Sequence, residues 1–217
     1  MNKSKIKLVI LDFDGTIGNT YEIITQTMIK TLSVLNLEPR TAEQCSKVIG
    51  LPLKQGFNEL IEISDDIAEK CVDTYREIFR ELDQVGLVKL FPHVIETIQE
   101  IKIHKKNIAI ASSRSRSSLL QYAERLNLKK SIDCIVGADD VIAAKPNPEP
   151  VEKILAFYGY KSEESIVVGD TKYDILMGKN AGSMTCGVTY GNGTLEELVE
   201  AGADFIIDDF EGILSIL

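Results

Sequence analysis

Six short apolar runs, each rich in strand-forming residues, recur along the chain and end in small or acidic residues. They span residues 7–12, 107–112, 132–137, 165–170, 184–189 and 204–207. Helical patterns separate most of these runs, and this alternation is typical of a parallel sheet with helices on both faces. Because the runs are continuously apolar, we expect strands that are buried on both sides. The chain is therefore predicted to be an α/β protein built on a parallel sheet.

The interval between the first two runs, about residues 18–86, departs from the alternation because it holds helical patterns and no convincing strand. Within it, Ser64 can cap a helix whose apolar residues recur at helical spacing over 67–82. We therefore predict a helical insertion at 18–86, and a sheet-bearing core formed by residues 1–17 and 87–217.

The charge of the chain restricts its partners. Among 217 residues, 26% are charged, and the formal net charge is -9. Nucleic acid and anionic lipid demand a basic surface, so we expect neither as a partner. A small anionic substrate would have to be met by a local group of positive charges.

The cysteines and the start of the chain bear on location. Four cysteines lie far apart, without the paired spacing of a zinc ribbon or a redox motif. We interpret them as buried small apolar residues in a reducing compartment. Residues 1–7 are basic but precede no long apolar region, and no stretch reaches the roughly 20 apolar residues of a membrane span. A cytoplasmic protein is expected.

Polar residues gather where the predicted strands end. In an open parallel sheet, ligands bind beyond the carboxyl ends of the strands, where loops meet helix N-termini. Acids, hydroxyls and one cation are all expected at this rim: Asp12, Asp14, Ser112, Ser113, Lys145, Asp170 and Asp174.

Four motifs run in order along the chain: DFDGT at 12–16, the serine pair 112–113 that ends AIASS, the Lys145-Pro146 step, and GDTKYD at 169–174. Their order, with a helical insertion after the first motif, resembles the haloacid dehalogenase-like superfamily of phosphohydrolases. The resemblance covers nearly the whole chain. It implies a Rossmann-like parallel-sheet core with an inserted helical-bundle cap domain of the type placed between the first and second motifs.

The resemblance also implies a reaction. Asp12 would attack phosphorus and form an aspartyl phosphate that water then hydrolyses. Asp14, two residues on, can donate a proton to the leaving oxygen and later activate water. Lys145 and the Ser112 hydroxyl would bind the phosphoryl oxygens, and Ser113 is predicted to contact the substrate.

A cation is expected at the same place. An anionic nucleophile and an anionic phosphate repel each other, and carboxylate oxygens are the ligands that Mg²⁺ prefers. The predicted ligands are Asp12, the backbone carbonyl of Asp14, and Asp170.

Neighbouring residues would support this site. Gly15 permits a tight turn, and Thr16 can bond to the loop backbone. Taken alone, Asp174 is a first-turn acid favoured by the helix dipole. Beside the other motifs, it is predicted to orient Lys145 or a water on the metal.

The sequence leaves the roles of two stretches undecided. Arg114 and Arg116 can be exposed charges at a helix start, or can contact substrate or cap, and we assign neither to the catalytic set. The stretch IGLPLKQGF at 49–57 resembles the loop with which such caps often touch the substrate, although an ordinary turn between helices explains it equally well. Lys54 is its candidate substrate-binding residue.

The choice within the superfamily follows from single residues. Asp14 favours phosphate chemistry over dehalogenation or phosphonate cleavage, and TYEIITQT lacks the histidine of sugar-phosphate mutases. The stretch 169–182 looks most like phosphoglycolate phosphatases and their pyrophosphatase relatives. We expect a magnesium-dependent phosphatase that acts on a small phosphorylated metabolite, and a phosphoglycolate-like monoester is the favoured substrate class. A pyrophosphatase or phosphosugar mutase is the alternative within the superfamily, and a catalytically silent phospholigand-binding regulatory protein is the alternative of another class.

Overall fold

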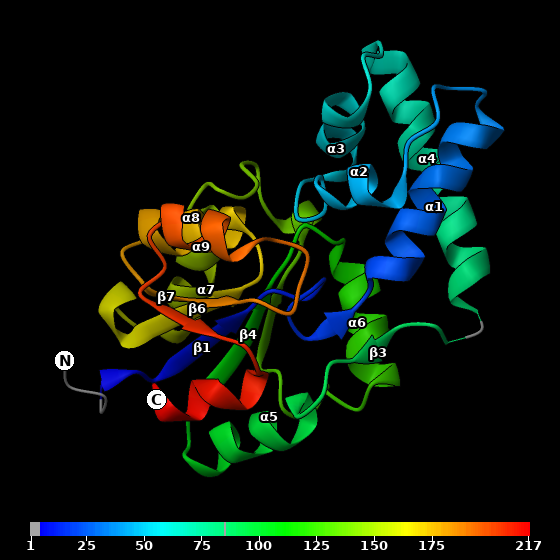
Figure 1. The fold of residues 1–217 in the computed structure, drawn as a ribbon. Helices are drawn as coiled ribbons and strands as arrows, with labels where there is room; N and C mark the ends of the chain where they lie inside the picture. The colour runs from blue at the N-terminus through cyan, green and yellow to red at the C-terminus, as the bar shows by residue number, and fades with distance from the viewer. Residues whose placement is uncertain (1–4, 85) are drawn as a thin grey trace.

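The computed structural model describes residues 5–84 and 86–217, and its six-stranded parallel sheet has the order β5-β4-β1-β6-β7-β8 (Figure 1). Each strand lies within one of the six predicted runs, so the α/β prediction is confirmed. The strands are β1 Leu8–Leu11, β4 Asn107–Ala111, β5 Cys134–Val136, β6 Ser165–Gly169, β7 Met184–Val188 and β8 Phe205–Ile207.

The central strand β1 places the first acid of the chain. Leu8 lies opposite Asn107 of β4 and Ser165 of β6, and all four residues of β1 are fully buried. The backbone N–H of Asp12 donates to the carbonyl of Val168 at 2.9 Å. The hydrogen-bonded ladder therefore continues one residue beyond β1 and holds Asp12 at the end of β6.

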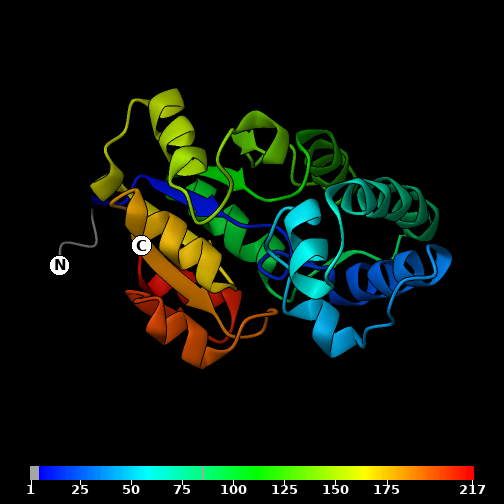
Figure 2. The same cartoon turned by 90° about the horizontal axis from the view of Figure 1, so that it is seen from above.

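Helices cover both faces of the sheet, as Figure 2 shows from above. One face packs on α5 (Val94–Ile103), α6 (Arg116–Arg125) and the 3-10 helix η4 (Phe210–Ser215). The other packs on α7 (Glu149–Tyr158) and α8 (Lys172–Asn180), with α9 (Leu195–Glu200) beside α8. Short 3-10 turns lie at η2 (Ala138–Asp140) and η3 (Ser162–Glu164). Because alternate residues of each strand enter opposite apolar clusters, the strands are buried on both sides, as their continuous apolar runs predict.

The helical insertion, defined here as α1 to α4, forms a separate group at the upper right of Figure 1. Its helices are α1 (Tyr21–Val34), α2 (Ala42–Ser46), α3 (Leu53–Leu60) and α4 (Asp65–Asp83). The Ser64 hydroxyl accepts the backbone N–H of Ile67 at 3.4 Å and caps α4, as predicted. Helix α4 packs on α1, and the buried residues of α4 include Tyr75 and Phe79.

One local prediction is wrong. The interval 18–86 was expected to hold no strand, but Gly18–Asn19 form β2, which pairs antiparallel with β3 (Lys89–Leu90). Two residues are too short for strand alternation to show in a sequence. The pair brings the two connections between the sheet and the helical insertion side by side.

Residues 1–4 of the predicted core and Val85 of the predicted insertion lie outside the described residues. No helix in the described ranges is long and apolar enough to cross a membrane. All four cysteines lie within those ranges, and each is a free thiol.

Candidate active site

The polar residues predicted at the rim lie at the carboxyl ends of neighbouring strands. Asp12 follows β1, Ser112 follows β4 and Asp170 follows β6, and all three are buried. Lys145, on the connection between β5 and α7, is also buried. Buried polar side chains need partners, so the contacts among these residues decide what the rim can do.

Lys145 is held between two carboxylates. Its Nζ lies 2.6 Å from Oδ1 of Asp12 and 2.5 Å from Oδ1 of Asp174. Burial alone would lower the pKa of Lys145, but the charges and hydrogen bonds of the two carboxylates outweigh it and raise that pKa. The ammonium therefore stays charged and fixes the direction of the Asp12 side chain.

Three carboxylates form a buried cluster. Oxygens of Asp12, Asp170 and Asp174 all lie within 4.8 Å of one another. Burial, followed by the other carboxylates, raises the pKa of Asp12 well above its usual range, although Lys145 opposes the shift. Burial and Asp174 raise the pKa of Asp170 to about 7. One ammonium therefore does not offset the mutual repulsion of the three carboxylates.

The cluster fits a divalent cation. When all three carboxylates are ionised, they exceed the one ammonium by two negative charges, and hard oxygen donors suit Mg²⁺ and similar ions. Asp174 has donors at both of its oxygens: its Oδ1 accepts from Lys145, and its Oδ2 accepts the N–H and hydroxyl of Thr171. Asp12 and Asp170, the carboxylate ligands predicted from the sequence, both belong to this cluster.

Asp170 is oriented by residues from two other loops. Its Oδ1 accepts the hydroxyl of Thr16 at 3.1 Å. Its Oδ2 accepts the backbone N–H and the side-chain amide of Asn192, at 2.7 and 2.9 Å. Thr16 was expected to bond within its own loop. It reaches Asp170 instead, because the loop after β1 packs directly against the end of β6.

Asn192 is a site residue that the sequence interpretation missed. It lies between two glycines in the loop after β7, at the same end of the sheet as the acids. A carboxamide in a glycine-rich loop after a predicted strand was the available signal. Gly15 has φ +87°, and a Cβ there would overlap the side chains of Asp170 and Asn192. The predicted turn thus also allows this close packing.

Asp14 points to a different partner. Nε and Nη2 of Arg114 donate to the two oxygens of its carboxylate, at 3.1 and 2.6 Å. Burial opposes the charge on Arg114, but the attraction and hydrogen bonds of Asp14 raise the pKa of this guanidinium. Arg114, which the sequence left open, also contacts Phe79 of the helical insertion. Arg116 bonds instead to Ile135 and Asp140.

The two serines after β4 have separate partners. The Ser112 hydroxyl accepts the backbone N–H of Arg114 at 3.3 Å. The Ser113 hydroxyl donates to the carbonyl of Gly50 at 2.6 Å and joins this loop to the helical insertion. Lys54 pairs with Asp65 and Glu69 on the surface of the insertion and is not among the residues that line the cavity described next.

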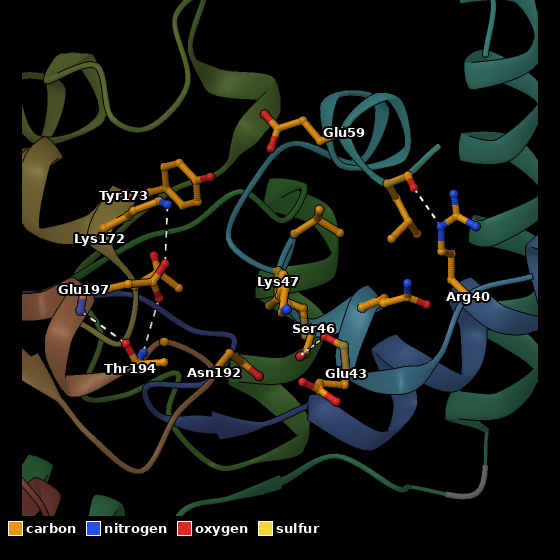
Figure 3. Close-up of a pocket in the computed structure, with 16 residues that line it drawn as sticks. Arg40, Glu43, Ser46, Lys47, Glu59, Lys172, Tyr173, Asn192, Thr194 and Glu197 are labelled. Carbon is orange, nitrogen blue, oxygen red and sulfur yellow. Dashed lines mark hydrogen bonds and ion pairs between the residues drawn. The ribbon is translucent and has the colours of Figure 1, made fainter. Parts of the chain in front are cut away.

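A cavity of about 840 Å³ lies between the helical insertion and the sheet core (Figure 3). Arg40, Glu43 and Lys47 line one wall, and Lys172 and Glu197 line the other. Thr171 and Asn192 also line it, and these residues bond Asp174 and Asp170 respectively. The cavity therefore adjoins the acid cluster, and its charged lining suits a small polar molecule.

Comparisons with known proteins cover most of the chain. Residues 9–188 match the family model for haloacid dehalogenase-like hydrolases. The chain is similar to the pyrophosphatase PpaX of Anoxybacillus flavithermus, with 32% identity over 98% of this chain and 97% of that protein. A PpaX of Bacillus cereus shares 32% identity over the same proportions.

Solved structures match over the same extent. A predicted phosphatase from Clostridium acetobutylicum superposes with a TM-score of 0.89 and 25% identity, over 97% of both chains. A predicted phosphoglycolate phosphatase from Haemophilus somnus superposes with a TM-score of 0.87 and 22% identity, over 98% of both chains. The second likeness concerns the fold alone.

Proposed function

The chain belongs to the haloacid dehalogenase-like hydrolases, and we propose that it is a magnesium-dependent phosphatase of a small phosphorylated metabolite that acts through an aspartyl phosphate. The buried arrangement of Lys145 between Asp12 and Asp174 carries this proposal. It fixes the direction of one carboxylate at the carboxyl end of the central strand, as an attacking group requires.

Side chains and one backbone N–H of the rim would carry out each step of the reaction. Asp12 Oδ1 is bonded to Lys145, which leaves Oδ2 to attack phosphorus and displace the leaving oxygen. The Lys145 ammonium, the Ser112 hydroxyl and the backbone N–H of Ser113 would bind the phosphoryl oxygens as negative charge develops on them. Asp14 would protonate the leaving oxygen and then take a proton from the water that hydrolyses the aspartyl phosphate.

Magnesium is the proposed cofactor. Asp12 and Asp170 would hold it together with the backbone carbonyl of Asp14, while Thr16 and Asn192 keep Asp170 in place. When bound, the ion would offset the repulsion between the carboxylate and the phosphate and polarise the phosphoryl group.

The helical insertion is proposed to act as a cap. Residues 18–86 would form this domain, and residues 1–17 with 87–217 would form the catalytic core. The Ser113–Gly50 hydrogen bond and the cavity between the two parts support this role, because closure over a substrate excludes bulk water. Lys54 stays a prediction, and its ion pairs on the insertion surface do not favour it. A cytoplasmic location also stays a prediction.

A phosphoglycolate-like monoester is the first proposed substrate class, from the motif resemblance in 169–182. Pyrophosphate is the second candidate, because the curated relatives at 32% identity are pyrophosphatases. The lysines and arginine in the cavity wall can meet a second anionic group, which both substrates carry.

Phosphate release from a panel of metabolites, with and without Mg²⁺, tests the proposal. The panel holds phosphoglycolate, sugar phosphates, nucleotides and pyrophosphate. We expect magnesium-dependent release concentrated on one compound, and a loss of more than about 10³-fold in Asp12→Asn with an unchanged circular dichroism spectrum. Substantial turnover by Asp12→Asn would contradict the mechanism. No release by the folded wild type would favour the mutase or the silent binding protein.

A further inference from the structure

Each of the three guanidinium nitrogens of Arg114 donates a hydrogen bond. Nε and Nη2 each donate to one carboxylate oxygen of Asp14, and Nη1 donates to the Ser118 hydroxyl at 3.2 Å. The side chains of Arg114 and Asp14 are only 10% and 15% exposed. A planar guanidinium bonded in this way fixes both the position and the plane of the carboxylate.

Aromatic rings from two parts of the chain enclose the guanidinium. Phe13 and Tyr122 of the sheet core lie 5.7 and 5.0 Å from its central carbon, and Phe79 of α4 lies at 4.9 Å. Phe79 is itself stacked on Tyr75 of the same helix. One side of the enclosure therefore exists only while α4 lies against the core.

A second arginine, Arg125, also joins the sheet core to the helical insertion, and it provides a comparison for Arg114. Arg125 donates to both oxygens of Asp83 at 2.9 Å, which joins α6 to the end of α4. It also lies 4.6 Å from the ring of Tyr122. Its partner, Asp83, has no part in the proposed reaction. The arrangement at Arg114 differs because its partner is the proposed proton donor.

We propose that Arg114 is a positioning residue that orients Asp14 toward the leaving oxygen, and that Phe79 makes this orientation depend on the placement of α4. The inference rests on the proposed function, in which Asp14 transfers the proton. A carboxylate has about four lone-pair sites, and the fork takes two, so a free site remains on each oxygen to face the substrate. An acid–base group oriented by a third residue is a general arrangement in enzymes.

The leaving group provides the test. An alkyl phosphate needs protonation of its departing oxygen, whereas p-nitrophenyl phosphate needs little, so the ratio of their kcat/KM values reports the position of the acid. With Mg²⁺ present, we expect Arg114→Met to lower kcat/KM for phosphoglycolate roughly 10²-fold and for the aryl ester less than about 10-fold. Arg114→Lys, which keeps the charge without the fork, should recover part of the loss.

Two further variants separate orientation from attachment. Phe79→Leu leaves Arg114 in place, and we expect the ratio to move in the same direction by a smaller factor. The matched control is Arg125→Met, which removes the tether at Asp83 but leaves the hydrogen bonds of Arg114 intact. We expect it to move the ratio less than Arg114→Met does, and no more than Phe79→Leu does, since it acts only through the placement of α4. Because Phe79→Leu removes no charge, it keeps the test available if Arg114→Met does not fold.

The outcomes are distinct. Equal losses on both esters in Arg114→Met, or a shift of the same size in Arg125→Met, would overturn the positioning role. An unchanged ratio in Phe79→Leu would overturn the link to α4. Failure of the proposed function would show separately, as turnover that survives in Asp12→Asn. If magnesium-dependent turnover is lost in Asp12→Asn but the ratio of the two kcat/KM values does not shift in the Arg114 variants, only the positioning role is overturned.

Discussion

A lysine buried between two carboxylates is the residue on which the candidate site depends. Lys145 is 3% exposed and bonds Asp12 and Asp174 at once. A buried ion pair contributes little net stability compared with an apolar packing, but removal of one partner leaves the others uncompensated. The cost of losing Lys145 should therefore be high even before catalysis is considered.

Lys145→Met should lower the free energy of unfolding by about 3–5 kcal/mol when no divalent ion is present, because two carboxylates lose their shared cation. Urea denaturation measures the change. The control is Lys102→Met, since Lys102 pairs with the partly exposed Asp133 and should cost less than about 1 kcal/mol. Equal costs for the two variants would contradict the structural role assigned to Lys145.

The proposed acid role of Asp14 makes a separate prediction. Asp14→Asn cannot donate a carboxylic proton, so kcat/KM for an alkyl phosphate should fall about 10²–10⁴-fold and that for p-nitrophenyl phosphate far less. Steady-state kinetics on both esters measure the two losses. Asp208→Asn, at an exposed acid outside the site, should change neither value. If both esters lose activity equally in Asp14→Asn, Asp14 is not the acid.

At the scale of helices and strands, two kinds of contact build the site: the pairing of parallel strands and the packing between other elements. Strands β1, β4 and β6 place Asp12, Ser112 and Asp170 at one end because parallel neighbours in register end together. Contacts between elements then complete the arrangement. His93, for example, immediately precedes α5 and bonds Asp209, which precedes η4.

The His93–Asp209 pair should make stability depend on pH. The hydrogen bond and charge of Asp209 raise the pKa of His93 above its usual value of about 6.5. The stability that protonated His93 contributes is therefore fully present below about pH 6.5, and it is lost as the pH rises through the pKa of His93 in the folded protein. Hydrogen bonds from Glu211 and His93 lower the pKa of Asp209, whose contribution is lost in acid. Both groups contribute between about pH 4 and 6.5.

His93→Asn removes the charge while keeping a residue that tolerates the positive φ of 59° found here. The difference in melting temperature between wild type and His93→Asn should be largest between about pH 4 and 6.5 and should shrink as pH rises above 7. Calorimetry across that range measures it. A difference that stays constant with pH would show that the pair contributes no electrostatic stability.

For the whole molecule, the acid cluster joins loops from opposite parts of the chain. Asp12 and Asp170 are contributed by β1 and β6, and Asn192 follows β7. A cation held by the folded arrangement and absent from the unfolded chain stabilises the fold through mass action. Metal binding should therefore be measurable without any substrate.

Mg²⁺ at about 100 times its dissociation constant should add about 2.7 kcal/mol to the free energy of unfolding, which is about 5–10 °C in Tm for a chain of this size. Thermal denaturation with and without Mg²⁺ measures the shift. Asp170→Asn should lose most of it, and Asp208→Asn should retain it. A shift of equal size in wild type and Asp170→Asn would place the ion elsewhere.

Several features of the site could not be predicted because they depend on packing between distant loops. Asp14 and Arg114 lie 100 positions apart, and Asp170 and Asn192 lie 22 apart. Both arginines at the start of α6 have the same local pattern, yet only Arg114 faces Asp14. Conversely, Lys54 belongs to a stretch that resembles a substrate-contacting loop, but it lies in α3 and pairs with Asp65. Local sequence cannot distinguish these outcomes.

The amino-acid sequence alone determined the α/β class, the six strands and the residues at their carboxyl ends, because apolar periodicity and strand termination are local properties. The order of the motifs was sufficient to predict the family and to propose Asp12 as the nucleophile. Only the tertiary structure decided which side chains meet: Lys145 with Asp174, Thr16 and Asn192 with Asp170, and Arg114 with Asp14. The physical reason is that such contacts depend on where the loops pack and on which way each side chain turns.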